Sequence, residues 1–568
     1  MVSRPVTTRS ISRSALLISA LGASCSQGPK AAHPSSAATL VLVGGDVRTL
    51  DPERPAATAI AIRGDRILAV GADAEVRRLA GPGARVIELA GKTVTPGLVD
   101  AHCHLHGLGA DLENVSVRGL SSEAETVQAM AAAAATRPAG EWLIGRGWDQ
   151  NRWPGQAFPT KAALDAAVSD RPVLLRRIDG HAVWVNSKAL AAAGVTAATP
   201  DPQGGKIVRG AGGEPTGVLV DTAMGLVDAV VPAPTAEHRE RRIRAAARRA
   251  VEVGLTGVHE MGIDDATAAV YRALAERGEL PLRVHAFLSG DAGDVARVRR
   301  NPEPAVGRFQ LRGVKFYADG ALGSRGARLS ADYDDDRGNR GLWVSPPEQL
   351  AFAVEVATSA GWQVAVHAIG DAAIGAVLDA LLAAQRKYPG EHRPRIEHLQ
   401  VLAPADLPRL VEARAIASMQ PTHATSDMPW AEQRVGAERI KGAYAWRAVI
   451  DAGVPVAAGS DFPVEEVSPL HGIYAAVTRQ DGRGEPAGGW YPAQRMTLDE
   501  ALTAFTYGAA YAGFAEDTRG RLAPGRLADL TVLDGVLAAD RSLLERKVAL
   551  TIVGGEIVYE ARPGGASR

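Results

Sequence analysis

Residues 95–104 read Thr-Pro-Gly-Leu-Val-Asp-Ala-His-Cys-His, a Pro-Gly turn that leads into a short apolar run ending in two histidines. Successive side chains of a β-strand point to opposite faces, so His102 and His104 are expected to share one face and Cys103 to point to the other. Two imidazoles on one face at the end of a buried strand can hold a metal ion. Because His-x-His pairs also occur by chance, the rest of the chain decides the interpretation.

Seven further apolar runs follow this stretch, and four of them carry a polar residue at or near their ends. The runs span residues 254–261, 283–289, 313–320, 363–370, 395–400, 416–421 and 455–463. The polar residues are Lys315, His367, His398 and Asp461. Segments of helical period, such as 351–360 and 373–386, separate most of the runs. Eight strands alternating with helices predict an α/β fold of the (β/α)8 TIM-barrel type, with functional groups at the C-terminal strand ends.

The segments flanking the predicted barrel (96–518) have a different character. Residues 39–95 and 519–562 contain apolar runs around Gly-Asp turns, which predict a small, discontinuous β-sandwich. Within the barrel, residues 105–253 separate the first two strands and are far longer than an ordinary βα connection. Because βα loops emerge at the active face of a barrel, this insertion is expected to form a substrate cap.

Residues 1–38 are expected to be a leader and a tether. Arg4, Arg9 and Arg13 precede an apolar run at 15–23, and Cys25 follows small residues. This pattern predicts a secretory signal, and it resembles a lipoprotein cleavage site. The expected location is therefore exported, either periplasmic or attached to a membrane through a lipidated Cys25. The alternative is a disordered extension on a cytoplasmic protein.

Composition narrows the classes of partner. The chain has 568 residues, with 63 Lys and Arg against 64 Asp and Glu, so no basic excess points to nucleic acid. Its two cysteines exclude a disulfide framework. The length suits a large barrel with additional modules, whereas the oligomeric state is not predicted.

Short motifs lie at the predicted strand ends and in the insertion. They are PGLVDAHCH (96–104), GRGWD (145–149), DGH (179–181), VK with DG (314–315 and 319–320), GSR (323–325), VHAIGD (366–371), EH (397–398) and GSD (459–461). Together they resemble the amidohydrolase superfamily, and within it the amidohydrolase-3 group of YtcJ-like proteins and N-substituted formamide deformylases. The resemblance covers residues 39–562.

The histidines, the aspartate and the lysine suggest a centre of two divalent metal ions. His102, His104 and Asp461 are expected to bind one ion, and His367 and His398 the other. Zinc suits this His and carboxylate set, although manganese, iron or cobalt would also fit. A free ammonium has no lone pair for a metal, so Lys315 needs a chemical change to act as the bridge. The resemblance implies that it is N-carboxylated, forming a carbamate that holds both ions.

The expected reaction is hydrolysis of a non-peptide C–N bond, with metal-activated water as the nucleophile. Asp461 would move the proton to the leaving nitrogen, and His181 would donate to the substrate oxygen from the cap. Substrate or ligand-orienting contacts are expected from Asp149, Asp319 and Arg325, although Arg325 could instead pair with an acid. The substrate is expected to be a small amide-like molecule, such as an N-substituted formamide or N-acyl amine.

Two other functions are compatible with the same scaffold. One is a mononuclear deaminase-like enzyme, against which Lys315 argues, because such relatives lack this strand-four lysine. The other is an exported binding or regulatory protein without catalysis, against which the complete set of six expected metal positions argues.

Overall fold

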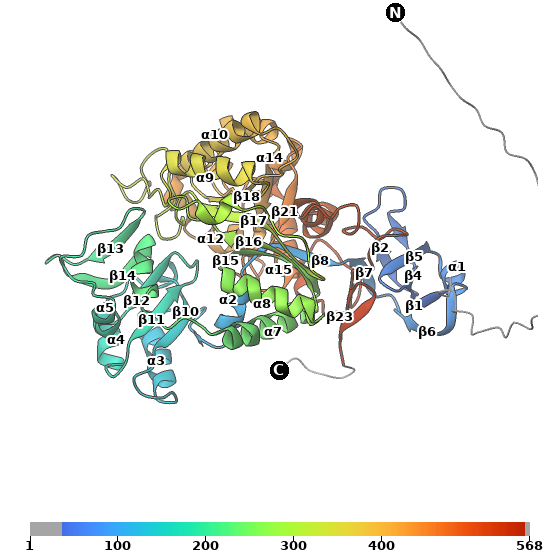
Figure 1. The fold of residues 1–568 in the computed structure, drawn as a ribbon, viewed down its shortest axis with the longest axis horizontal. Coiled ribbons are helices and arrows are strands. Elements are labelled where there is room, and N and C mark those ends of the chain that lie inside the picture. Colours follow the sequence, from blue (N-terminus) through green and yellow to red (C-terminus); the bar gives the residue numbers. More distant parts are fainter. Residues whose placement is uncertain (1–36, 563–568) are drawn as a thin grey trace, which may run out of the picture.

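The computed structural model describes residues 37–562, which form three regions along one axis (Figure 1). A central barrel lies between a cap and a β-sandwich. The predicted leader and Cys25 lie outside the described residues. In residues 37–562, no helix has the length and apolar character needed to cross a membrane.

The central sheet of the described chain confirms the predicted (β/α)8 barrel. Eight strands run in consecutive order around it, and every adjacent hydrogen-bonded pair is parallel. Each of the eight predicted runs contributes one strand. The strands are β8 (Leu98–Cys103), β15 (Leu255–Ile263), β16 (Arg283–Ser289), β17 (Phe309–Tyr317), β18 (Gln363–Ala368), β19 (Arg395–His398), β20 (Ile416–Met419) and β21 (Val456–Ala458).

Residues that follow β21 close the barrel against β8. The Ser460 backbone N–H and hydroxyl both donate to the buried Asp100 carboxylate, and the Asp461 N–H donates to the His102 carbonyl at 2.7 Å. This approach requires glycine at position 459, because a Cβ there would lie 2.5 Å from Asp100 Oδ1. The closure brings the end of the last strand beside the first histidine pair.

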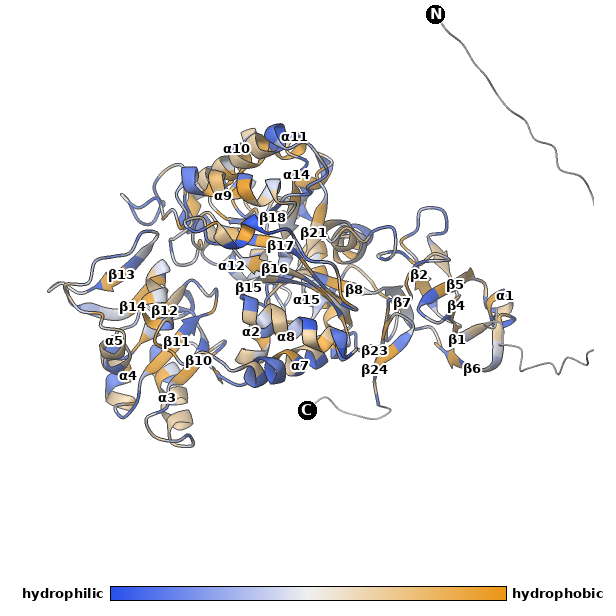
Figure 2. Cartoon of the chain, viewed as in Figure 1, coloured by the Kyte–Doolittle hydropathy of each residue, from blue (hydrophilic) through white to orange (hydrophobic). Residues whose placement is uncertain are grey.

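Helices cover the outside of the barrel with apolar faces. In α10, for example, Ile374, Val377, Leu378 and Leu381 recur at helical spacing and are buried. Figure 2 shows hydrophobic colouring along the barrel strands, while α7 carries both colours. The helices of this region are α2 (Leu105–Asp111), α7 (Ala236–Glu252), α8 (Asp265–Glu276), α9 (Pro347–Ser359), α10 (Asp371–Lys387), α11 (Leu407–Glu412), α12 (Pro421–Asp427), α13 (Ala431–Arg439), α14 (Trp446–Asp451), α15 (Pro469–Thr478), α16 (Leu498–Thr503) and α17 (Ala509–Ala512).

The cap is built on a six-stranded sheet with the order β13-β14-β12-β11-β10-β9 among the described residues. Trp148 and Trp184 fill its core. The helices α2 and α7, which bound the insertion 105–253, pack on each other rather than joining the sheet. The cap elements are β9 (Val115–Ser116), α3 (Glu123–Ala134), β10 (Leu143–Trp148), α4 (Lys161–Ala167), β11 (Val173–Arg177), β12 (Ala182–Val185), α5 (Ser187–Ala192), β13 (Gly205–Arg209), β14 (Pro215–Asp221) and α6 (Gly225–Asp228).

The third region combines both flanking segments of the chain in two packed sheets. One sheet has the order β5-β4-β1-β6, and the other has the order β24-β23-β22-β7-β2-β3 within residues 37–562. Leu42, Ile60, Val94 and Ile552 share one core between them. The strands are β1 (Ala38–Val43), β2 (Asp46–Arg48), β3 (Ala56–Ala57), β4 (Ala59–Arg63), β5 (Arg66–Gly71), β6 (Ala80–Glu88), β7 (Thr93–Pro96), β22 (Leu530–Leu533), β23 (Val548–Val553) and β24 (Glu556–Glu560), with helix α1 (Asp73–Arg77) beside them.

Candidate active site

His102 and His104 at the end of β8 point into the barrel mouth, and each has a protein acceptor on one ring nitrogen. His102 Nδ1 lies 2.5 Å from Glu397 Oε2, and His104 Nδ1 lies 3.0 Å from the Met261 carbonyl oxygen. A ring that donates from Nδ1 keeps a lone pair on Nε2 when it is neutral. Both Nε2 atoms are therefore free to act as ligands.

His367 and His398, from the next part of the barrel, complete a group of four imidazoles. The ring centre of His398 lies 4.7 Å from those of both His102 and His367. His398 Nδ1 lies 2.8 Å from Gln420 Oε1, and His367 Nε2 lies 3.3 Å from the Gly320 carbonyl oxygen. These acceptors leave Nε2 of His398 and Nδ1 of His367 as the nitrogens with lone pairs.

Asp461 lies among these rings as predicted. Its Oδ1 is 3.1 Å from His104 Nε2 and 3.5 Å from His102 Nε2. Oδ1 is buried and has no hydrogen-bond partner among residues 37–562. Asp461 and His398 also adopt φ angles of +62° and +73°, a left-handed conformation that costs non-glycine residues about 1–3 kcal/mol each. Such strain is characteristic of functional sites.

Lys315 on β17 is the buried cation of the group. It is 1% exposed, and its Nζ lies 3.4 Å from His102 Nε2. Among the described side chains, no carboxylate comes within 4.0 Å of Nζ. Burial lowers the pKa of Lys315 to about 8 despite the opposing charges of Glu397 and Asp461. About a tenth of the amine is therefore neutral at pH 7, far more than for an ordinary lysine.

His423 is a site residue that the sequence analysis missed. It lies on α12, directly after barrel strand β20, with Nε2 3.4 Å from Asp461 Oδ2 and Nδ1 3.1 Å from Glu465 Oε1. Burial opposes its charge, but hydrogen bonds to Asp461 and Glu465 prevail and raise its pKa to about 10. The available signal was its place just after the run 416–421, the same kind of position that the predicted ligands occupy.

The sequence analysis also missed the buried charged residues behind the histidines. Glu397, Arg395 and Glu260 hold the predicted ligands in place. Glu397, fully buried on β19, accepts from His102 and receives Arg395 Nε at 2.7 Å. Burial disfavours the Glu397 charge, but Arg395 and His102 keep its pKa below the usual range. Glu260 accepts the backbone N–H groups of Leu105 and His106, which fixes the turn after His104.

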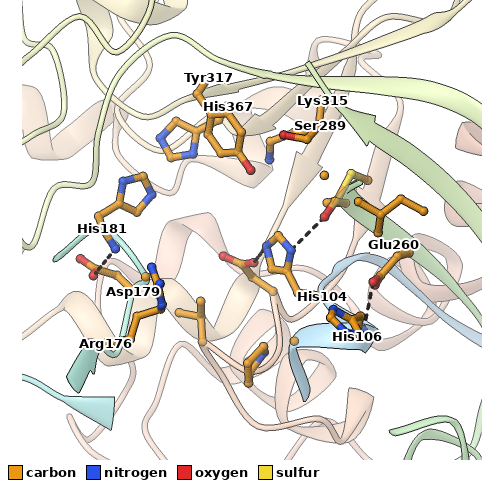
Figure 3. Close-up of a pocket in the computed structure, with 18 of the residues that line it drawn as sticks. His104, His106, Arg176, Asp179, His181, Glu260, Ser289, Lys315, Tyr317 and His367 are labelled. Carbon is orange, nitrogen blue, oxygen red and sulfur yellow. Dashed lines mark hydrogen bonds and ion pairs between the residues drawn. The ribbon is translucent and has the colours of Figure 1, made fainter. Parts of the chain in front are cut away.

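His181 reaches this centre from the cap. Its ring centre lies 5.0 Å from that of His367, and its Nδ1 lies 2.7 Å from Asp221 Oδ1. Burial opposes the cation, but Asp221 outweighs that effect and raises the pKa of His181. When protonated, the ring carries an N–H on Nε2 that can donate to a ligand. In Figure 3, His181 and Asp179 face His367, Tyr317 and Lys315 across the cavity.

Two cavities meet at the cluster. The first, of about 750 Å³, is lined by the barrel ligands together with cap residues such as Arg146 and Arg176. The second, of about 1060 Å³, extends past His423 toward aromatic residues that include Trp430 and Trp490. Both are lined by His181, His367, His398 and Asp461, so a ligand at the cluster can extend to either side.

The three predicted substrate contacts have different outcomes. Asp149 lines the second cavity and pairs with Arg177 at 2.6 Å. Asp319 is fully buried, lines neither cavity and accepts the backbone N–H groups of Ile369, Gly370 and Arg328, so it supports the His367 loop instead. Arg325 also lines neither cavity, because Asp335 binds its guanidinium at 3.0 Å. Asp319 therefore has the place of a ligand-orienting residue, and Arg325 forms the acid pair named as its alternative, while a substrate contact of either residue stays a prediction.

Comparison with known proteins identifies the family. The family described as "Amidohydrolase family" matches residues 85–559 of the chain. The chain belongs to the amidohydrolase family. The protein named "Putative amidohydrolase YtcJ" of Bacillus subtilis (strain 168) is 36% identical over 531 residues, which cover 91% of this chain and 98% of that protein.

Two further comparisons agree with this assignment. The N-substituted formamide deformylase of Arthrobacter pascens is 31% identical over 544 residues, covering 92% of this chain and 98% of that protein. A solved structure of an uncharacterized metal-dependent hydrolase from Pyrococcus horikoshii OT3 superposes with a TM-score of 0.71 at 27% identity, covering 88% of this chain and 97% of that one.

The donor set of this amidohydrolase fits divalent metal ions. His102, His104 and Asp461 place one ligand atom each within 4.8 Å of one another, and so do His398, His423 and Asp461. Each ring of the four-imidazole group is oriented by a hydrogen bond on its other nitrogen, as is usual for metal-binding histidines. Asp461 Oδ1, which is buried beside the two histidines and accepts no hydrogen bond in the described chain, suits a cation as well.

Proposed function

We propose that this amidohydrolase hydrolyses a non-peptide amide C–N bond in a small molecule, such as an N-substituted formamide or another N-acyl amine. The observation that carries the proposal is the arrangement of four imidazoles whose free nitrogens and Asp461 converge in one cavity. The residues that would hold two divalent ions, of which zinc suits the donor set best, are His102, His104, Lys315, His367, His398 and Asp461. When bound, such ions lower the pKa of water and polarise a carbonyl oxygen.

Lys315 contributes once it is converted to a carbamate. The neutral amine attacks carbon dioxide, forming an N–C bond and releasing one proton, and the product carries a carboxylate. The low pKa of Lys315, about 8, supports this reaction because it supplies neutral amine. The carbamate thereby replaces a buried ammonium group by an anion. This anion would compensate part of the positive charge of the bound metal ions.

Asp461 and His181 handle the proton and the developing charge. Asp461 accepts the proton of the attacking water and returns it to the leaving nitrogen, while His423, 3.4 Å from Asp461 Oδ2, keeps the carboxylate oriented. His181 donates its Nε2 hydrogen to the substrate carbonyl oxygen, where negative charge develops, and Asp221 holds its ring.

The test is metal content per chain on protein purified in bicarbonate buffer, beside a Lys315→Ala variant. Two metals in the wild type, falling in the variant, together with hydrolysis of members of a formamide and N-acyl amine panel, support the proposal. One tightly held metal in both proteins would favour a mononuclear deaminase-like enzyme. No metal even after reconstitution would overturn the catalytic proposal and favour a binding role.

A further inference from the structure

Two arginines stand side by side on the cap sheet where it faces the active site. Arg146 on β10 and Arg176 on β11 are direct register partners in a parallel strand pair, and both line the first cavity. Like charges placed opposite each other on neighbouring strands repel and destabilise the pair. A sheet that retains such a pair needs a compensating anion.

Only one of the two guanidinium groups has that compensation. Arg176 Nη2 lies 2.7 Å from Asp228 Oδ1. In the described chain, no carboxylate lies within 4.0 Å of Arg146, whose Nη2 donates only to the Ile178 carbonyl oxygen at 2.9 Å. Its Nε is buried without any hydrogen-bond partner. Arg146 therefore has unused donors in a cavity where buried donors are nearly always paired.

The remaining charges around Arg146 do not supply the missing partner. Asp111 and Asp461 attract it only at longer range, while Arg118 and Arg176 repel it. Of the acids that line the same cavity, Asp179 pairs with Arg177, Asp221 with His181, and Asp264 with Arg239. The fourth, Glu260, accepts two backbone N–H groups. The fifth, Asp461, lies 3.1 Å from His104 Nε2 and 3.4 Å from His423 Nε2. Each of these acids thus contacts another group, and none forms an ion pair with Arg146.

We propose that Arg146 is an anion-binding subsite that selects amides carrying a carboxylate. A guanidinium presents a planar fork of N–H donors that matches a carboxylate, and a partly buried site strengthens that contact. The subsite lies on the cap side of the cavity that contains Lys315 and the histidines. The carboxylate of the substrate is therefore expected at the end of the molecule that extends toward the cap. This inference rests on the proposed function and specifies its substrate class.

The first test compares N-formyl ω-amino acids of increasing chain length with N-formylalkylamines of the same lengths. In the metal-loaded wild type, kcat/KM for the best anionic substrate is expected to exceed that for its neutral match by at least about tenfold. Arg146→Gln should bring this ratio close to one, and Arg146→Lys should give an intermediate ratio, since it keeps the charge without the fork. Lys206→Gln is the matched control, because it removes an exposed cap cation on β13 that lines neither cavity and should leave the ratio unchanged.

A second readout separates this inference from the proposed function. Calorimetry measures the binding of N-methylsulfonyl ω-amino acids, which the enzyme cannot hydrolyse as amides, against neutral N-alkylmethanesulfonamides. Tighter binding of the anionic series by wild type, about tenfold and lost in Arg146→Gln, supports the subsite even if no formamide is hydrolysed, in which case only the proposed function fails. Equal binding of both series, or a preference that survives in Arg146→Gln, overturns the subsite whatever the hydrolysis results.

Discussion

Glu397→Gln should weaken metal binding without removing any metal ligand. Glu397 Oε2 accepts from His102 Nδ1 at 2.5 Å and from Arg395 Nη2 at 3.1 Å, and Glu397 Oε1 accepts from Arg395 Nε at 2.7 Å. Glutamine has the same shape, but its NH2 group must face one of these two donors. Either His102 or Arg395 then loses its acceptor in a fully buried position.

The size of the effect follows from that lost hydrogen bond. A hydrogen bond involving a charged group contributes about 1.5–3 kcal/mol. At about 1.4 kcal/mol per tenfold change, this corresponds to about 10- to 100-fold weaker metal affinity, the range known for changes next to metal-bound histidines. The free energy of unfolding should also fall, by about 3–5 kcal/mol, because Arg395 loses its buried carboxylate.

The assay is competition for zinc against a fluorescent chelator, with an unfolding curve for each protein. Ser418→Ala is the matched control, since Ser418 Oγ accepts from Arg395 Nη2 at 2.8 Å but does not contact His102. A folded Glu397→Gln protein with metal affinity within about twofold of wild type would refute the reasoning. An equal loss of affinity in Ser418→Ala would show that Arg395, rather than the His102 bond, carries the effect.

Three other outcomes are expected. His181→Ala should lower kcat about 100-fold with a smaller effect on KM, as measured by steady-state kinetics on the best amide, because it removes a donor to the substrate oxygen. Gly459→Ala should cost about 1–3 kcal/mol in urea unfolding because its Cβ overlaps Asp100, whereas Gly212→Ala, at a position open to solvent, should be neutral or stabilising. Burial raises the pKa of Asp427 from its ordinary value of 3.8 to about 7, so at intermediate pH the folded state holds a proton that the unfolded state has lost. The contribution of Asp427 to stability should therefore fall as pH rises from about 4 to about 7, by at most about 4 kcal/mol. Asp427→Asn should remove this contribution from the difference in stability between about pH 5 and about pH 8, and a difference equal to that of wild type would refute the prediction.

The barrel was predictable because its signals are local and repeated. Each strand is a short apolar run, and the polar residues at the ends of four runs and at 102–104 share one rim by the geometry of parallel strands. His423 was missed because it lies in α12, beyond the end of β20 at Met419, where neither strand alternation nor a motif marks it and only its place after the run 416–421 points to it. Its role depends on the distance to Asp461, which only the closed barrel defines.

Arg325 and Asp319 show that the contact partners of a charged side chain cannot be predicted from its local sequence. Both stand near motif residues, but their partners come from a loop that folds back from residue 335 and from the backbone at 369–370. Whether a charged side chain faces a ligand or a neighbouring loop is settled by such long-range contacts. The same reasoning applies to Arg146, to which the sequence analysis assigned no role. Its possible function is visible only from its position beside Arg176 on the neighbouring strand.

The stem formed by α2 and α7 divides this molecule into parts that can change independently. The two helices stand at the ends of the cap insertion, and the strands on either side of it, β8 and β15, are hydrogen-bonded neighbours. The barrel rim is thus complete without any strand from the cap. An exchange of residues 113–234 between relatives would replace the walls of the entrance, with His181 and Asp221 among them, while keeping the histidines and Asp461 of the barrel rim. Substrate range can then diversify in evolution by cap replacement, provided that the new cap supplies a donor in place of His181.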